Sequence, residues 1–131
     1  MTNQVHRILC VDDEPILTEV LGLVVTELDL PFELVVAGHP HEVRRVLAEG
    51  PVAMVMLDVN MPEVNGLDLA AEITGDHPDL AVLVYSADGD VHREAALRAG
   101  AKGYLCKPFD LDELLAILRD WLPPENQSIA S

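Results

Sequence analysis

Apolar stretches alternate with amphipathic ones along the chain. The apolar stretches are short and nearly continuous, and they predict strands at residues 6–11, 32–38, 52–57, 80–86 and 103–106. Between and after them, apolar positions recur at helical spacing and predict helices near residues 15–29, 40–49, 66–75, 90–99 and 110–121. Strands that are apolar on both faces are typical of a parallel sheet covered by helices. The pattern therefore predicts an α/β fold with a doubly wound, five-stranded parallel sheet.

Residues with known positional preferences mark the ends of several helices. Asp110 precedes the last helical pattern and Glu113 follows three residues later, which predicts a capping box. Gly100 follows "EAALRA", where a helix terminator in the left-handed conformation is expected. In the first helix, the apolar positions expected to face the core are Leu17, Leu21, Val24 and Leu28.

The composition indicates a single water-soluble domain. Of the 131 residues 50% are apolar, and no apolar run approaches the roughly 18 residues of a membrane span. The N-terminus lacks the features of a secretory signal, so a cytoplasmic location is expected. The formal net charge of −15 argues against direct binding to nucleic acid or to a membrane. We expect the domain to span residues 5–122, with residues 123–131 as a polar tail or linker.

Polar side chains stand where four of the five predicted strands end. Asp12 and Asp13 follow the first strand, Asp58 the third, Ser86 ends the fourth and Lys107 follows the fifth. Because the carboxyl ends of parallel strands lie along one edge of a sheet, these side chains are expected to share a pocket. Acids at strand ends can also act only as caps of the following helices, but that explains one or two of these positions rather than all five.

Three carboxylates in one pocket need compensating positive charge. At about 5 Å and an effective dielectric constant of 20, each pair repels by roughly 3 kcal/mol. Lys107 offsets one such repulsion, and Mg²⁺, which prefers oxygen ligands, is the cofactor expected to offset the rest. Asp58 would then be a nucleophile beside cations that neutralise a transferring phosphoryl group. Met61 is expected to anchor the loop after Asp58, and Asn65-Gly66 to form the turn into the next helix.

Four motifs together resemble the receiver domain of two-component response regulators, of the chemotaxis-regulator type. They are "ILCVDDEP", "LDVNMPEVNGLDL", "VYSA" and "AKGYLCKPF", and they stand in the family's order and at its usual intervals. The resemblance covers residues 5–122 and implies the flavodoxin-like strand order 2-1-3-4-5, which the receiver family itself exemplifies. It implies a phosphorylation-dependent signalling switch rather than an enzyme with a separate substrate. Such a switch catalyses only its own phosphoryl transfer and autodephosphorylation.

The resemblance assigns roles to individual residues. Asp58 matches the aspartate that is phosphorylated by a sensor histidine kinase or a histidine phosphotransfer protein. Asp13 matches the direct Mg²⁺ ligand and Asp12 the acid that holds the metal through water, while the backbone carbonyl of Asn60 completes the set together with Asp58. Lys107 matches the lysine that pairs with the phosphoryl group.

Further residues match the family's switch and its tuning positions. Ser86 matches the hydroxyl that moves to the phosphoryl oxygen, and Tyr104 the aromatic that moves inward with it. Asn60 and Asp88 match the positions that tune the lifetime of the phosphoryl group.

The resemblance also implies two interaction surfaces. A downstream protein or output domain would bind the face made by the helix near 90–99, the strand at 103–106 and the last helix, and a homodimer through this face is also open. Ile16 and Leu23 lie about 100° away from the core-facing stripe of the first helix. We expect them to help dock the phosphodonor, although scattered exposed apolar residues are also normal.

Three other functions are compatible with this fold. A degenerate receiver would bind partners without phosphorylation, but the acids, the serine and the lysine are all present. An aspartate-nucleophile phosphatase on the same fold usually has a second acid two residues after the nucleophile, where this chain has Asn60. A flavin-binding domain fails because "DDEP" would repel a phosphate. The short tail favours a complete single-domain regulator slightly over a receiver cut from a longer chain.

Overall fold

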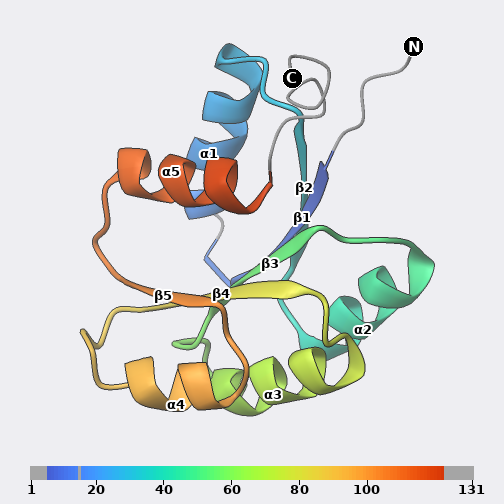
Figure 1. The fold of residues 1–131 in the computed structure, drawn as a ribbon, viewed down its shortest axis with the longest axis vertical. Coiled ribbons are helices and arrows are strands. Elements are labelled where there is room, and N and C mark those ends of the chain that lie inside the picture. The colour runs from blue at the N-terminus through green and yellow to red at the C-terminus, as the bar shows by residue number, and fades with distance from the viewer. Residues whose placement is uncertain (1–5, 15, 123–131) are drawn as a thin grey trace.

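Strands and helices alternate through the chain, as a computed structural model that describes residues 6–14 and 16–122 shows (Figure 1). The strands are β1 (His6–Val11), β2 (Phe32–Ala37), β3 (Met54–Asp58), β4 (Ala81–Ser86) and β5 (Gly103–Cys106). The helices are α1 (Ile16–Glu27), α2 (Pro40–Glu49), α3 (Gly66–Asp76), α4 (Arg93–Arg98) and α5 (Leu111–Trp121). The expected tail at 123–131, residue 5 and Pro15 lie outside the described residues.

All strand pairs are parallel, and the strand order is β2-β1-β3-β4-β5. Helices α1 and α5 cover one face of the sheet, and α2, α3 and α4 cover the other (Figure 1). The predicted doubly wound sheet and its flavodoxin-like order are therefore confirmed. This order places β1, β3 and β4 side by side in the centre, so that the groups at their carboxyl ends are neighbours.

Alternate residues of the central strands enter two separate cores. In β1, Ile8 and Cys10 join the core beneath α1 and α5, whereas Leu9 and Val11 join the core above α2, α3 and α4. All five residues of β3 are buried. Burial on both faces explains why these strands are apolar at consecutive positions rather than alternating. Burial also raises the pKa of the Cys10 thiol to about 12.

Several local expectations are confirmed. Gly100 has a φ of 104° and ends α4 in the left-handed region. Asn65 caps α3, since its side chain accepts a hydrogen bond from the Asp68 amide at 3.1 Å. Met61 is buried in the core.

Other local expectations are wrong. Asp110 stands at the N-cap of α5 in an extended conformation, but its side chain makes no capping hydrogen bond. Leu28 is 53% exposed rather than in the core, because α1 ends at Glu27 and the helical period no longer holds beyond it. Helix α4 is also shorter than predicted, and β3 starts at Met54 rather than at residue 52. Among the described residues, no helix is long and apolar enough to cross a membrane.

Candidate functional site

The polar groups predicted to meet do meet at the carboxyl edge of the sheet. Asp58, the last residue of β3, is 1% exposed, and Asp12, directly after β1, is 4% exposed. Ser86 ends β4 and is fully buried. Lys107 follows β5, and its Nζ donates a hydrogen bond to Asp58 Oδ2 at 2.9 Å. The shared edge thus brings together side chains that are up to 95 residues apart, from Asp12 to Lys107.

Four acids form the electronegative centre of this edge. Asp12, Asp13, Glu14 and Asp58 each offer a carboxylate oxygen, and these four oxygens lie within 4.8 Å of one another. A cation relieves the repulsion between carboxylates that lie this close together, and a set of carboxylate oxygens suits a hard divalent ion such as Mg²⁺. The residues therefore fit a Mg²⁺ site. Glu14 was not among the predicted ligands, although it directly follows Asp12 and Asp13 in the sequence.

Both carboxylate oxygens of Asp12 are held in place. Oδ1 accepts a hydrogen bond from the Glu14 amide at 2.9 Å, and Oδ2 accepts one from the Tyr85 hydroxyl at 2.7 Å. Burial raises the pKa of Asp12, and the nearby charge of Asp58 raises it further, against the lowering effect of the two hydrogen bonds and of Lys107. A bound cation would favour the ionised form that burial disfavours.

Hydrogen bonds link the loop after β3 to the loop after β4. Asp58 Oδ1 accepts from the Asn60 amide at 2.8 Å. The Asn60 side chain accepts from the Ala87 amide at 2.6 Å and donates to Asp88 Oδ2 at 2.9 Å. Ser86 Oγ accepts from the Asp88 amide at 3.0 Å. The predicted tuning residues Asn60 and Asp88 are therefore direct partners, one in the loop after β3 and one in the loop after β4.

His92 is a neighbour that the sequence did not point to. Its Nε2 lies 3.0 Å from Asp88 Oδ2, next to the bond from Asn60. The hydrogen bond to His92, followed by that to Asn60, holds the pKa of Asp88 below its usual range. Asp88 is therefore ionised and oriented at the mouth of the site.

The loop that follows Asp58 is fixed against the start of α3. Gly66, the first residue of α3, is buried, and a Cβ at this position would lie 2.6 Å from the Cα of Val59. Real Cβ atoms do not approach a backbone atom so closely, so only glycine lets α3 begin against the residue that follows Asp58. The buried Met61 side chain holds the same loop from the core.

The chain combines a parallel sheet of order β2-β1-β3-β4-β5 with a cluster of acids and an Asp58–Lys107 pair at the carboxyl edge of the sheet. Residues 8–119 match the response regulator receiver domain family. The chain belongs to this family. Phosphorylation-dependent signalling in two-component systems is the function of the family.

Individual relatives of this receiver domain are known from several bacteria. The transcriptional regulatory protein TcrA and the response regulator MprA, both of Mycobacterium tuberculosis, are each 40% identical to it over 114 residues, which is 86% of this chain. The match spans 44% of TcrA and 49% of MprA, so the chain covers less than half the length of these relatives. The response regulator TrrA of Thermotoga maritima superposes with a TM-score of 0.77 at 30% identity, over 90% of this chain and all of TrrA.

The predicted switch residue of the receiver, Tyr104, is buried in β5 beside α4. Its hydroxyl donates a hydrogen bond to the Gly89 carbonyl at 2.6 Å, and the guanidinium of Arg93 lies 4.9 Å from the centre of its ring. Gly89 belongs to the loop that follows Ser86. The structure therefore connects Tyr104 to the site through the loop between β4 and α4.

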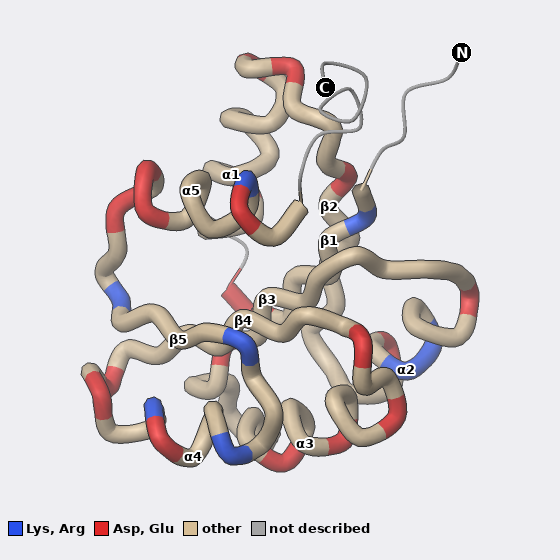
Figure 2. The backbone as a smooth tube through the Cα atoms, in the orientation of Figure 1, with Lys and Arg blue, Asp and Glu red and all other residues tan. Residues whose placement is uncertain are grey.

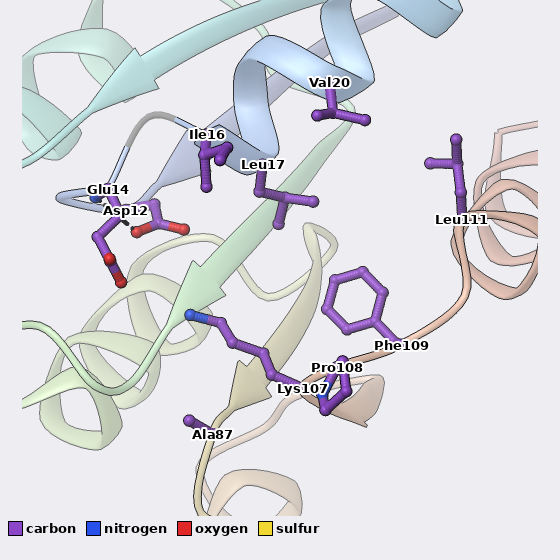
Figure 3. Close-up of a pocket in the computed structure, with 10 residues that line it drawn as sticks. All are labelled: Asp12, Glu14, Ile16, Leu17, Val20, Ala87, Lys107, Pro108, Phe109 and Leu111. Carbon is purple, nitrogen blue, oxygen red and sulfur yellow. Dashed lines mark hydrogen bonds between the residues drawn. The ribbon is translucent and has the colours of Figure 1, made fainter.

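An apolar groove opens beside the acids of the receiver, with a volume of about 710 Å³. Ile16, Leu17 and Val20 of α1 form one wall (Figure 3). The other wall is the segment after β5 together with the start of α5, and its members are Lys107, Pro108, Phe109 and Leu111 (Figure 3). Ile16 is 69% exposed and lines the groove, whereas Leu23 is 66% exposed but does not line it.

The surface charge of the receiver is predominantly negative. Acidic residues number 23 against 8 lysines and arginines, and they are spread over the helices and loops (Figure 2). One exposed pair is bidentate: the Arg44 guanidinium makes two hydrogen bonds to Glu72 at 2.7 and 2.8 Å and so joins α2 to α3. Exposed apolar residues such as Val36, Val91 and Leu97 also occur elsewhere on the surface, but the groove gathers several apolar side chains beside the acids.

Proposed function

We propose that Asp58 accepts a phosphoryl group from a phosphohistidine of a sensor histidine kinase or a histidine phosphotransfer protein. The observation that carries this is the position of Asp58, a buried carboxylate at a strand end inside a cluster of acids and 2.9 Å from the Nζ of Lys107. One oxygen of Asp58 forms the new bond to phosphorus while the bond from phosphorus to the imidazole nitrogen breaks. The product is an aspartyl phosphate, and the imidazole leaves with the electron pair of the broken bond.

The other side chains hold the reacting groups and balance their charge. Asp13, Asp58 and the Asn60 carbonyl would bind Mg²⁺ directly, and Asp12 would bind it through water. When bound, Mg²⁺ neutralises the charge on the phosphoryl oxygens. TrrA, similar in sequence and fold, was crystallised in complex with Mg²⁺–BeF, which supports the choice of metal. The ammonium group of Lys107 would transfer its hydrogen bond from Asp58 to a phosphoryl oxygen.

Phosphorylation would change the loop between β4 and α4. A phosphoryl oxygen is a stronger acceptor than a neutral group, so the Ser86 hydroxyl would turn to donate to it. The bond that Ser86 Oγ now accepts from the Asp88 amide would be lost, and the loop that also holds Tyr104 would shift. This biases an existing equilibrium between two arrangements of the face made by α4, β5 and α5. That face is where we place a downstream protein, an output domain or a second receiver.

The side chains of Asn60 and Asp88 would set the lifetime of the aspartyl phosphate. Asn60 and Asp88 flank Asp58 and are hydrogen-bonded to each other at 2.9 Å. Their polar side chains would orient a water molecule that attacks the phosphorus. The protein would thus catalyse its own phosphorylation and dephosphorylation and act as a regulator. The net charge of −15 disfavours direct contact of this domain with nucleic acid or membranes.

The proposed chemistry is tested by intact-mass analysis after incubation with acetyl phosphate. With Mg²⁺ present we expect a gain of one phosphoryl group, and with excess chelator we expect none, because the charge of the acids would then oppose the incoming phosphoryl group. A folded protein that gains no phosphoryl group under either condition would contradict the proposal. It would favour a degenerate receiver that acts through binding alone.

The apolar groove and the exposed side of α1 are the proposed docking surface for the phosphodonor. We expect the double substitution Ile16→Ala, Leu23→Ala to slow phosphoryl transfer from the partner kinase about fivefold or more, because truncating an anchoring side chain typically costs over 1 kcal/mol. Transfer from acetyl phosphate should be unchanged, since this small donor makes no such contacts. The measurement is the initial rate of phosphorylation with each donor.

The control for the docking surface is Leu28→Ala. Leu28 is similarly exposed but lies beyond the end of α1, so its loss should not change the rate with the kinase. An unchanged rate for the double variant would contradict the role of Ile16 and Leu23 and would leave Asp58 chemistry unaffected.

A further inference from the structure

Tyr85 stands between the core and the acid cluster. It lies in β4 next to Ser86, it is 1% exposed, and its ring packs in the core beneath α1 and α5. Phe109 contacts the ring edge-on, with ring centres 6.0 Å apart. In the sheet, the backbone of Tyr85 is paired with that of Asp58 in β3. Its hydroxyl, however, bonds to Asp12, which follows β1 on the far side of β3. The side chain therefore joins the fourth strand to the loop that follows the first.

Tyr85 contacts two of the charged groups around Asp58. Its hydroxyl donates to Asp12 Oδ2 at 2.7 Å, and the Nζ of Lys107 lies 5.1 Å from the centre of its ring. The Glu14 amide holds the other oxygen of Asp12 at 2.9 Å. A carboxylate oxygen has two acceptor positions, so each oxygen of Asp12 keeps one of them for a metal ion or a metal-bound water.

We propose that Tyr85 is a positioning residue of the metal site, which fixes the orientation of Asp12 toward the cation. This inference rests on the proposed Mg²⁺-dependent function. Without the hydroxyl, Asp12 would be held at one oxygen only and would have to be ordered when the metal binds. Partners that orient a direct metal ligand commonly change metal affinity by ten- to a hundredfold when removed, and because Asp12 would hold the metal through water, the effect of Tyr85 is expected at the lower end of this range.

The test is the affinity of the Tyr85→Phe variant for Mg²⁺, measured by isothermal titration calorimetry at constant ionic strength. Phenylalanine keeps the ring, and with it the contacts to Phe109 and Lys107, and removes only the hydroxyl. We expect Mg²⁺ to bind about tenfold more weakly than to the wild-type protein. Equal affinity would overturn the role of Tyr85 alone. A wild-type protein that binds no Mg²⁺ would overturn the proposed metal site, and this inference with it.

A second variant separates the hydrogen bond from packing in the core. Leu83 precedes Tyr85 by two residues in β4, belongs to the same core and is fully buried. Leu83→Val should lower the free energy of unfolding through lost packing but leave the affinity for Mg²⁺ unchanged. A tenfold loss of affinity in both variants would show that Tyr85 acts through general packing, and would overturn its role as a positioning residue.

Discussion

The Asp58→Asn variant is expected to lose phosphoryl incorporation completely. An amide has nearly the shape of a carboxylate, and its single oxygen can still accept one of the two hydrogen bonds that separate oxygens of Asp58 take from Lys107 and from the Asn60 amide. The neutral amide is, however, a very poor nucleophile at phosphorus. The substitution also removes one of the carboxylates that would hold Mg²⁺. The measurement is the intact mass of the variant and of the wild-type protein after the same treatment with acetyl phosphate and Mg²⁺.

A matched acid provides the control for this experiment. Asp90 is exposed and pairs with Arg93 outside the acid cluster, so Asp90→Asn should still gain one phosphoryl group. If Asp58→Asn gained a phosphoryl group at the wild-type rate, the acceptor would be another residue and the assignment of Asp58 would be wrong. Circular dichroism of the variant confirms that any loss does not come from unfolding.

The architecture was predictable because its main determinant is local in the sequence. Burial on both faces demands apolar residues at consecutive positions, and the central strands β1, β3 and β4 meet this demand almost without interruption. The ends of helices were less predictable. The helical spacing of Leu17, Leu21 and Leu28 does not reveal that α1 ends at Glu27. Asp29, shortly after this end, has a positive φ.

The acids and the lysine of the site could be predicted from a single rule of topology. Each follows or ends a strand, and the carboxyl ends of parallel strands share one edge. Tyr85 could not be found in this way, because an aromatic residue inside an apolar strand looks like any core residue. Its hydroxyl matters only because the strand order brings β4 within reach of Asp12, and no spacing in the sequence encodes that distance. His92 was missed for a different reason: it follows its partner Asp88 by only four residues, but the two side chains meet because of the turn before α4.

The proposed direct ligand, Asp13, is expected to couple Mg²⁺ to the stability of the fold. In the wild-type protein, Mg²⁺ at a hundred times its dissociation constant should raise the free energy of unfolding by about 2.7 kcal/mol. If Asp13→Asn weakens binding a hundredfold, the same Mg²⁺ concentration gives only about 0.4 kcal/mol. Without Mg²⁺ the variant should be equally stable or slightly more stable, because one of four mutually repelling carboxylates is gone and Asp13 is exposed to screening water. Urea unfolding with and without Mg²⁺ measures both effects.

In a metal ligand, the substitution reduces the stabilisation by Mg²⁺ but does not lower the stability measured without Mg²⁺. A residue that merely supports the fold would show the loss of stability in both conditions. Asp79 provides the control, since it is an exposed acid just before β4, at the other edge of the sheet, and Asp79→Asn should keep the full response to Mg²⁺. A full response in Asp13→Asn would remove Asp13 from the proposed ligands. A variant that loses stability equally with and without Mg²⁺ would assign Asp13 to the fold instead. A carboxylate that repels its acidic neighbours lowers the free energy of unfolding until a cation binds. Only a variant that loses the response to Mg²⁺ without losing stability in its absence fits this role for Asp13.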